Sequence, residues 1–424
     1  MTVYLGLGSN LGDRKHNLDT AIRKLVTAGF KLEKISPLVE SPAMLPERAD
    51  PSWNRPFLNL VIAGNADWTP ERGLAIAKEI ESELGREQGP RWSSRPIDID
   101  LLVWHQECRS SEELTLPHSG IPERDFVLTP LLHLKPDLRI PGVEKTVFEL
   151  SRGRRNIPLW MGIVNLTPDS FSDGDSWGDQ AALAAYIDKL IDQNIQIIDL
   201  GAESTRPNAD KVEQDAEWLR LQPVLKLIHE QVAGAQIRPM ISLDSRHPRV
   251  IEKALELGID MINDVTGLGD PAMLRLARDS GCQIVAMHAM TVPVDPKVLL
   301  PSDRSAVTQL EEWIDAKANH WLDQGINLNR MIVDPGIGFG KNSIQAYELM
   351  SHCRALRRSG MRVLIGHSRK SFMAGLTDRP AAQRDLETVG ISLALCDQGA
   401  DIIRVHHPFI HQRAYRAWSH IRKA

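Results

Sequence analysis

The sequence has few cysteines and no long apolar run, and these absences exclude several classes of protein. The cysteines stand far apart and form no Cys-x-x-Cys pair (Cys108, Cys282, Cys353 and Cys396). We therefore expect neither a zinc site nor a disulfide framework, and free thiols fit a reducing cytoplasm. No apolar run reaches the roughly 18 residues of a membrane span. The strand-like beginning Thr2-Val-Tyr-Leu-Gly-Leu lacks the basic segment of a signal peptide.

A strong net charge is also absent. The 50 basic and 55 acidic residues leave a net charge of -5, so the chain has no electrostatic footprint for nucleic acid or an anionic membrane. Hydrophobic residues make up 42% and charged residues 25%, as in ordinary globular proteins. A chain of 424 residues exceeds what one hydrophobic core usually serves, which predicts two domains. We expect a cytoplasmic protein whose partners are small molecules.

The two domains are expected to meet at a polar, basic stretch punctuated by Gly and Pro, Ser151-Arg-Gly-Arg-Arg-Asn-Ile-Pro158. We place the first domain at 1–152, the linker at 153–157 and the second domain at 158–424. In the first domain, apolar patterns predict strands over 3–8, 57–63 and 97–103 and helices over 17–28 and 71–84. This mixture is an antiparallel α+β pattern.

The second domain repeats short apolar runs that are separated by sequence of helix length. These eight strand candidates lie at 159–164, 195–200, 240–243, 261–262, 284–286, 331–333, 363–365 and 402–405. Alternating strands and helices imply a parallel sheet, and eight units in about 250 residues predict a (β/α)8 TIM barrel. The runs are apolar without alternation, as strands buried on both faces should be.

Polar side chains follow every one of these runs, where a barrel of this kind places its catalytic groups. Asp244, Asn263 and Asp334 offer acceptors and amide groups suited to the edge of a flat heterocycle. A cationic set suited to phosphate oxygens consists of Arg206, Arg369, Lys370, Arg404 and His406. Asn165 opens a stretch from Leu166 to Trp177 whose composition is typical of a mobile lid. Any one of these residues could be an ordinary loop residue, but together they favour a site.

Longer strings in this half resemble the dihydropteroate synthases. They are Met161-Gly-Ile-Val-Asn-Leu-Thr-Pro-Asp-Ser-Phe-Ser-Asp-Gly174, Ile198-Asp-Leu-Gly-Ala-Glu-Ser-Thr-Arg-Pro207, Asp334-Pro-Gly-Ile-Gly-Phe-Gly-Lys341, Gly366-His-Ser-Arg-Lys-Ser371 and Arg404-Val-His406. The resemblance covers nearly all of 158–424. It implies an enzyme that condenses a pterin diphosphate with p-aminobenzoate and releases diphosphate.

The same resemblance implies roles for individual residues. The pterin would be held by Asp244, Asn263, Asp334 and Lys370, with Met287 packed nearby. Asn165 would bind one Mg²⁺, and the diphosphate would meet Arg206, Arg404 and His406. The p-aminobenzoate site would be bordered by Thr205, Pro207, Phe339 and Ser371. Lys370 and Arg404 would be the catalytic cations. His407 follows His406 where the family usually has a carboxylate or a small residue.

In the first domain, the informative stretch is Arg91-Trp-Ser-Ser-Arg-Pro-Ile-Asp-Ile-Asp100. On a strand, Asp98 and Asp100 lie on one face about 6–7 Å apart, while Ile97, Ile99 and Leu101 lie on the other. Two such carboxylates repel each other unless a cation lies between them, and Mg²⁺ with nucleotide phosphates would suit. A solvent-facing strand with two charges is the alternative. Arg86, Arg91 and Arg95 favour polyphosphate chemistry, because arginine stabilises the charge of a transferring phosphoryl group.

This half resembles the hydroxymethyldihydropterin pyrophosphokinases over about residues 1–150. The matching motifs are Gly6-Leu-Gly-Ser-Asn-Leu-Gly12, Phe57-Leu-Asn59, Arg91-Trp92 with Arg95-Pro-Ile-Asp-Ile-Asp100, Leu116-Pro-His118 and Arg124-Asp-Phe126. The resemblance implies a ferredoxin-like α+β fold and transfer of diphosphate from ATP to the pterin hydroxymethyl group. The chain departs from the family at Ser93 and Ser94, at Ser119 and in a longer segment over 43–56.

The roles implied here divide among metal, nucleotide and pterin. Asp98 and Asp100 would hold two Mg²⁺. The catalytic cations would be Arg86 and Arg95, and the pterin would lie against Phe57, Asn59 and Phe126. ATP would be contacted by Lys78, Glu81, Trp92, Arg95, His118 and Arg124.

The two halves would then catalyse consecutive steps, because the diphosphate ester made by the first is the electrophile used by the second. Dimerisation through the barrel is a further implication of the resemblance. Two alternatives differ in class: a barrel that serves as a pterin-binding methyltransferase, or one half that serves only as a docking module. The Ser-Arg-Lys and Arg-x-His motifs argue against the first, since a methyl donor offers no diphosphate to bind. The intact pair of Asp98 and Asp100 argues against the second.

Overall fold

The computed structural model describes residues 2–87, 89–90, 92–166, 180–204 and 211–422. Within them the chain forms two compact units. The first is built mainly from residues up to Ile157, and the second from Pro158–Ala233 and Arg238–Ala414. The linker predicted at 153–157 falls at the end of the first unit, directly after a short helix, α4 (Val147–Arg152). No helix of the described residues is long and apolar enough to cross a membrane.

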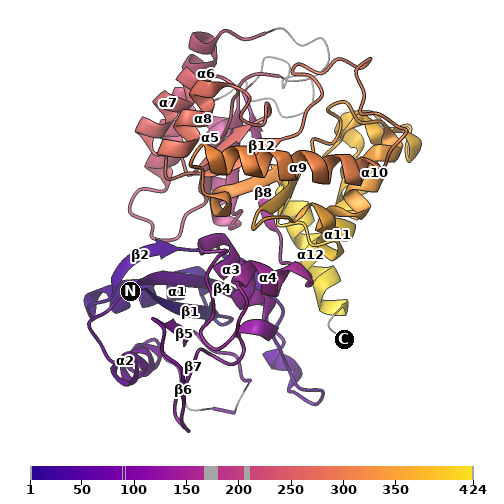
Figure 1. Cartoon of the computed structure of the whole chain (residues 1–424). Coiled ribbons are helices and arrows are strands. Elements are labelled where there is room, and N and C mark those ends of the chain that lie inside the picture. Colours follow the sequence, from indigo (N-terminus) through magenta and orange to yellow (C-terminus); the bar gives the residue numbers. More distant parts are fainter. Residues whose placement is uncertain (1, 88, 91, 167–179, 205–210, 423–424) are drawn as a thin grey trace. The chain divides into compact units, whose positions relative to one another are not determined.

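The first unit is an antiparallel sheet with helices on both faces (Figure 1). Its strand order is β2 (Lys31–Ile35), β4 (Phe57–Asn65), β1 (Val3–Ser9) and β5 (Asp98–Trp104), and β3 (Val39–Ser41) also pairs with β4. This order and direction, with α1 (Arg14–Thr27) and α2 (Pro70–Glu83) as crossovers, is the ferredoxin-like arrangement. A small hairpin of β6 (Arg109–Ser110) and β7 (Thr115–Leu116) follows β5.

Alternation along β5 divides its side chains between two hydrophobic layers. Ile99 and Leu101 pack with α1 and α2 in one core cluster, and Leu102 packs with α3 (Asp125–Leu134) in the other. Asp98 and Asp100 therefore point to the α3 side of the sheet, and they lie on the face opposite Ile99 and Leu101, as the sequence predicted. Local signals agree with the helix ends: Asp13 caps α1, Thr69 caps α2, and Gly85 follows α2 with φ +84°, which favours glycine.

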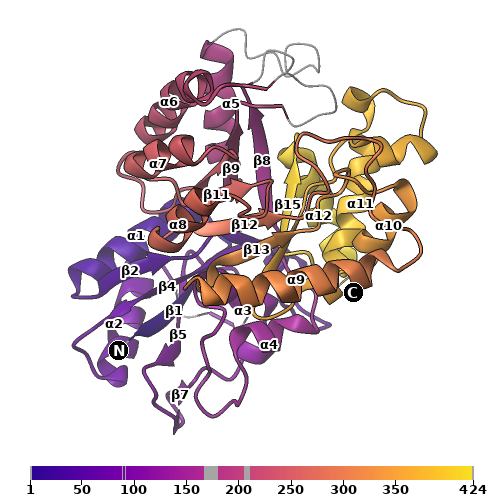
Figure 2. The same ribbon diagram turned by 45° about the horizontal axis from the view of Figure 1, so that its top comes forward.

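The second unit is a closed parallel barrel, whose strands are enclosed by helices in Figure 2. The strands are β8 (Leu159–Asn165), β9 (Ile197–Gly201), β10 (Met240–Asp244), β11 (Met261–Asp264), β12 (Gln283–Met287), β13 (Met331–Asp334), β14 (Arg362–Ile365) and β15 (Ile402–Val405). The helices are α5 (Gln180–Asp192), α6 (Gln214–Gln231), α7 (Pro248–Leu257), α8 (Pro271–Asp279), α9 (Ala306–Asp323), α10 (Ser343–Ser351), α11 (Asp385–Asp397) and α12 (Pro408–Ile421). β8 pairs with β15 and closes the barrel, so the predicted (β/α)8 fold is confirmed.

Candidate functional sites

A cavity of about 280 Å³ lies on the α3 side of the first unit's sheet. Its lining includes eleven residues that the sequence assigned to this site: Phe57, Asn59, Lys78, Arg86, Trp92, Arg95, Asp98, Asp100, His118, Arg124 and Phe126. Gly6 and Gly8, which belong to a family motif but were given no role by the sequence, also line the cavity, as do Ser41 and Met44, which the sequence did not single out. Gly8 has a clear reason to be glycine, because a Cβ there would lie 3.0 Å from Asn59 Oδ1. Residues from several of the family motifs therefore line one cavity.

Asp98 and Asp100 are surrounded by cations that lie at unequal distances. Arg86 Nη1 lies 2.5 Å from Asp98 Oδ1, and Arg95 Nη1 lies 3.3 Å from Asp98 Oδ2. Burial opposes ionisation of Asp98, but these two guanidinium groups lower its pKa. Burial and the charge of Asp98 raise the pKa of Asp100, whose nearest cation, Arg124, is 3.6 Å away. A cation bound beside the two carboxylates would therefore stabilise the ionised form of Asp100.

The donor set fits Mg²⁺ held together with nucleotide phosphates. Among the described residues, no group of three or more His, Cys, Asp or Glu side chains is placed to hold a metal ion alone. Mg²⁺ commonly takes one or two carboxylates from the protein and completes its shell with water and phosphate oxygens. Asp98 and Asp100 supply two carboxylates on one face of β5, each with a partly exposed side chain.

Glu81 is buried beside this site and contacts two of its cations, Arg86 and Lys78. Its Oε1 accepts the backbone N–H of Ile99 at 2.8 Å and lies 2.5 Å from Arg86 Nη1, while Lys78 Nζ lies 2.9 Å from Oε2. Glu81 does not line the cavity, although the sequence grouped it with the ATP contacts. It joins α2 to β5 and holds Arg86 and Lys78 toward the cavity.

His118 has a defined tautomer. Its Nδ1 accepts the backbone N–H of Gly120 at 3.0 Å, so in the neutral ring the proton is on Nε2. Burial lowers the pKa of His118, and the charge of Asp100 partly opposes this. The neutral ring therefore presents Nε2–H as a donor.

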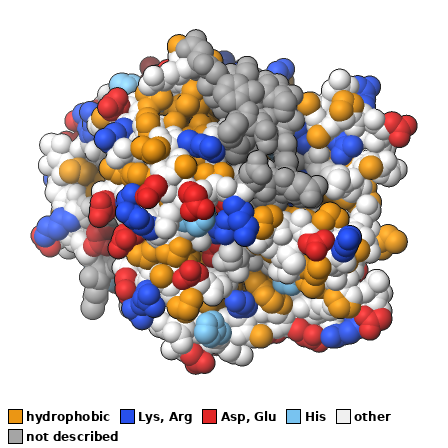
Figure 3. All heavy atoms as spheres, turned by 90° about the horizontal axis from the view of Figure 1, so that it is seen from above, with side chains coloured by type: hydrophobic (Ala, Val, Ile, Leu, Met, Phe, Trp, Pro, Cys, Tyr) orange, Lys and Arg blue, Asp and Glu red, His pale blue; other side chains and the backbone are white. Residues whose placement is uncertain are grey.

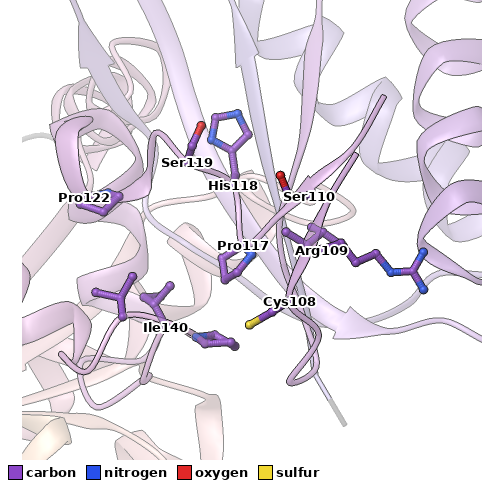
Figure 4. A pocket seen from close by; sticks show the side chains of 12 residues that line it. Cys108, Arg109, Ser110, Pro117, His118, Ser119, Pro122 and Ile140 are labelled. Atoms are coloured by element: carbon purple, nitrogen blue, oxygen red, sulfur yellow. The ribbon is translucent and has the colours of Figure 1, made fainter. Parts of the chain in front are cut away.

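Two further cavities adjoin the first. One of about 610 Å³ shares Lys78 with it and is also lined by Glu71, Leu74, Arg109 and Leu114. The other, of about 430 Å³, shares His118, which lies with Ser119 at one end in Figure 4. The guanidinium of Arg109 points away from Cys108 and Ile140 in this view and pairs with Glu107 at 2.8 Å.

In the barrel, the carboxyl ends of neighbouring strands bring the predicted pterin residues together. Asp244 pairs in register with Asn263 on one side and with Gly201 on the other, and Met287 pairs with Asp334. Arg404 lies between two carboxylates: its Nε is 2.6 Å from Asp199 Oδ2, and its Nη2 is 2.8 Å from Asp244 Oδ2. Asp199 was not among the site residues that the sequence predicted.

Asp334 and Lys370 face the same point from β13 and from the loop after β14. A Cβ on Gly366 would lie 3.7 Å from Asp334 Oδ2, 3.9 Å from Lys370 Nζ and 3.9 Å from Arg404 Cδ, so these groups converge where Gly366 leaves space. Lys370 donates to the carbonyl of Ile337 at 2.6 Å, and its Nζ is 5.0 Å from the ring centre of Phe339. Burial lowers the pKa of Lys370 to about 8 and raises that of Asp334.

The structure separates the neighbouring histidines after β15. His406 Nδ1 lies 2.9 Å from Ser368 Oγ, two residues before Lys370 in sequence, whereas His407 Nε2 lies 3.7 Å from Asp385. Arg369, which the sequence grouped with the cations suited to phosphate, is already paired within the protein. Its guanidinium is buried against Asp385 through Nε at 2.7 Å and Nη2 at 3.0 Å.

The remaining predicted barrel residues divide into placed and undescribed ones. Asn165 ends β8, and its Oδ1 would lie 3.6 Å from a Cβ on Gly201, so an amide oxygen of the kind that can bind Mg²⁺ lies at the strand-end face. Met287 packs with Phe339, and Ser371 begins a short 3₁₀ helix directly after Lys370. Thr205, Arg206, Pro207 and most of the predicted lid from Leu166 to Trp177 lie outside the described residues.

Charge is mixed on the face that Figure 3 presents. Figure 3 shows basic and acidic side chains interspersed with hydrophobic ones over the face that it presents. That mixture differs from the continuous basic field by which nucleic-acid-binding surfaces are recognised.

Comparisons with known proteins identify a family for each half of the chain. The family model of pterin binding enzymes matches residues 161–406, and that of the 7,8-dihydro-6-hydroxymethylpterin-pyrophosphokinases matches residues 4–136. A folate synthesis bifunctional protein of Chlamydia trachomatis is 35% identical over 437 residues, covering 98% of this chain and 97% of the relative. A mitochondrial folate synthesis bifunctional protein of Arabidopsis thaliana is 32% identical over 453 residues, covering 96% and 80%.

Solved structures of dihydropteroate synthases are similar to the barrel. The dihydropteroate synthase of Yersinia pestis, solved with a sulfonamide drug, superposes with a TM-score of 0.57 at 31% identity and covers 63% of this chain and 95% of its own. That of Anaplasma phagocytophilum, solved with 6-hydroxymethylpterin-monophosphate, gives a TM-score of 0.55 at 30% identity and covers 62% and 98%.

The two folds and their sites define a pair of pterin-converting transferases joined in one chain. The chain belongs to the family of bifunctional folate synthesis proteins. It transfers diphosphate from ATP to 6-hydroxymethyl-7,8-dihydropterin, and it condenses the resulting pterin diphosphate with p-aminobenzoate to give 7,8-dihydropteroate. Enzymes of these families use ATP and Mg²⁺. The methyltransferase and docking-module alternatives are set aside.

Proposed function

We propose that the cavity of about 280 Å³ holds the pterin and the phosphate end of ATP. The pterin would lie between Phe57 and Phe126, with Asn59 reading its polar edge. Asn59 suits this role because it is buried and its amide is fixed by donation to Ser41 Oγ at 3.0 Å. The cavity of about 610 Å³ that shares Lys78 would take the nucleoside of ATP.

In this arrangement, the pterin hydroxymethyl oxygen attacks the β-phosphorus of ATP. The new O–P bond forms as the bond between that phosphorus and the α-phosphate oxygen breaks, so AMP leaves and the hydroxyl proton is lost. Arg86, Arg95 and Arg124 balance the charge on the phosphoryl oxygens, and His118 donates from Nε2. Two Mg²⁺ at Asp98 and Asp100 would supply further charge neutralisation when bound.

In the barrel, we propose that Asp244, Asn263, Asp334 and Lys370 hold the pterin ring. Arg404 and His406, with Arg206, would bind the diphosphate, and one Mg²⁺ would bind at Asn165. Phe339 and Ser371, with Thr205, would border p-aminobenzoate, and Met287 would pack beside the pterin. The carbon–oxygen bond to diphosphate breaks, the aryl amine nitrogen bonds to the methylene carbon, and that nitrogen loses a proton. The convergence of Asp334, Lys370 and Arg404 at Gly366 carries this assignment.

A reciprocal pair of variants in the full chain tests both assignments. At limiting Mg²⁺, Asp100→Asn should strongly reduce ATP-dependent AMP formation and leave condensation of supplied pterin diphosphate with p-aminobenzoate unchanged. Lys370→Met should do the reverse. Each site thus serves as the folding control for the other, and loss of both activities, or of neither, in both variants would overturn the residue assignments.

We also propose that the protein is cytoplasmic and forms a homodimer through the barrel domain. The proposed domain limits are 1–152 and 158–424. The cytoplasmic location rests on the free cysteines, Cys108, Cys282, Cys353 and Cys396. Sedimentation of the full chain tests the dimer: a single species with the 47.4 kDa mass of one chain at micromolar concentration would contradict it.

A further inference from the structure

Asp199 is a fully buried carboxylate in the middle of an apolar strand, β9. It pairs in register with Ser242, two residues before Asp244, so it lies one layer below the strand ends that carry the proposed pterin contacts. Its Oδ2 lies 2.6 Å from Arg404 Nε, and the amide Nδ2 of Asn263 donates to its Oδ1 at 3.3 Å. A buried carboxylate of this kind is costly unless it is paired.

The two contacts fix the orientation of two different side chains. An ionised carboxylate only accepts hydrogen bonds, so Asn263 must turn its NH₂ group toward Asp199 and its Oδ1 elsewhere. Arg404 is held at Nε by Asp199 and at Nη2 by Asp244, which fixes the plane of the guanidinium. Without Asp199, the guanidinium of Arg404 would be held only through Nη2 by Asp244, and its plane would no longer be fixed.

We propose that Asp199 is a positioning residue for recognition of the pterin diphosphate, which acts by orienting Arg404 and Asn263. This inference rests on the proposed function of Asp244 and Asn263 as pterin contacts and of Arg404 as a diphosphate contact. It assigns a role in binding to a residue that a purely structural account would treat as part of the barrel interior.

Asp401 offers a matched control in the same barrel. It is also buried and ion-paired with an arginine, Arg357, at 3.1 Å. It directly precedes β15 and so lies at the opposite end of the strands from Asp244. Asp199→Asn and Asp401→Asn therefore remove equivalent charges, one beside the proposed pterin site and one far from it.

The test measures thermal melting, kcat and both KM values of the full-length enzyme with each variant. Asp199→Asn should raise the KM for pterin diphosphate about tenfold or more, the loss expected for one hydrogen bond to a charged group. Its KM for p-aminobenzoate should stay within about twofold, because the proposed aryl site does not touch Asp199. Asp401→Asn should lower the melting temperature and leave both KM values unchanged.

Equal pterin KM values in Asp199→Asn and wild type would overturn the inference. So would a combined effect with Arg404→Lys that equals the product of the single effects, because residues acting through one guanidinium should be non-additive. If Asp199→Asn does not fold, Asp199→Glu keeps the charge but displaces it, and an unchanged pterin KM there would overturn the inference equally. The proposed function fails separately, if Lys370→Met retains full condensation activity.

Discussion

Asn10 and Arg95 are joined by a reciprocal pair of hydrogen bonds across 85 residues of sequence. The backbone N–H of Arg95 donates to Asn10 Oδ1 at 2.7 Å, and the backbone N–H of Asn10 donates to the carbonyl oxygen of Arg95 at 3.2 Å. The Asn10 amide also donates to Ser94 Oγ at 3.4 Å. The end of β1 thus anchors the arginine loop at the residue whose guanidinium meets Asp98, and Ser94 takes part in the anchor.

Replacing Asn10 by Ala should impair the kinase step without affecting the synthase step. The backbone N–H of Arg95 would lose its buried acceptor, and the loop would no longer hold Arg95 toward Asp98. We expect kcat/KM for ATP to fall about tenfold. Asn65→Ala, which removes a bond to Glu33 on the exposed end of β4, is the matched control and should behave as wild type. Kinase activity equal to wild type in Asn10→Ala would show that the anchor does not orient Arg95.

Asp98→Asn and Asp100→Asn should each raise the Mg²⁺ concentration needed for half-maximal AMP formation. Each variant removes one carboxylate from a site that has two, and we expect a rise of about tenfold or more. Burial and Asp98 raise the pKa of Asp100, so acid should also weaken Mg²⁺ binding. The measurement is a Mg²⁺ titration of AMP release at several pH values. Asp137→Asn, which affects only a partly exposed pair with Lys135, controls for net charge. Identical Mg²⁺ curves for all three variants would contradict the metal assignment.

Much of the fold was predictable because buried parallel strands read as continuous apolar runs. Other elements gave weak signals. β2 is mostly exposed and rich in charge, and α3 contains Pro130, which argues against a helix interior when read alone. The site residues also differ in how clearly the sequence indicates them. Asp244 and Asp334 end their strands and could be found from that rule, whereas Asp199 lies among Ile197, Ile198 and Leu200, where the same rule does not apply.

Side-chain direction also had to come from the structure. Arg369 and Lys370 are adjacent in sequence, yet one pairs with Asp385 and the other reaches the site. Arg369 adopts φ +60°, an unusual conformation for a residue other than glycine, and this turn separates the two side chains. Residue type alone could not distinguish the two cations.

His118→Gln should retain more kinase activity than His118→Asn. The imidazole uses Nδ1 as an acceptor for Gly120 N–H and presents Nε2–H to the cavity. The amide nitrogen of Gln reaches about as far as Nε2, while that of Asn reaches only as far as Nδ1. Steady-state rates of AMP formation at saturating pterin would give the comparison, with condensation activity as the internal control. Equal losses in both variants would show that the Nε2 donor is not used.

Binding of the pterin substrate by the barrel should release protons at mildly acidic pH. Burial raises the pKa of Asp244 to about 7, and the nearby charge of Asp199 adds to this, although Arg404 opposes it. A carboxyl group that accepts pterin N–H groups must be ionised, so the fraction competent to bind falls as the pH drops through about 7. Affinity should therefore fall up to about tenfold per pH unit below that value.

Calorimetry in buffers of different ionisation enthalpy measures this proton release directly. We expect release approaching one proton below the Asp244 pKa and almost none well above it. In Asp199→Asn, the loss of one negative charge should lower the pKa of Asp244, and the pH midpoint should move toward acid. Other charged groups near Asp244, namely Arg404, Lys370, Glu217 and Asp264, are unchanged in that variant. A midpoint that stays the same would mean that Asp244 is not the group that titrates on binding.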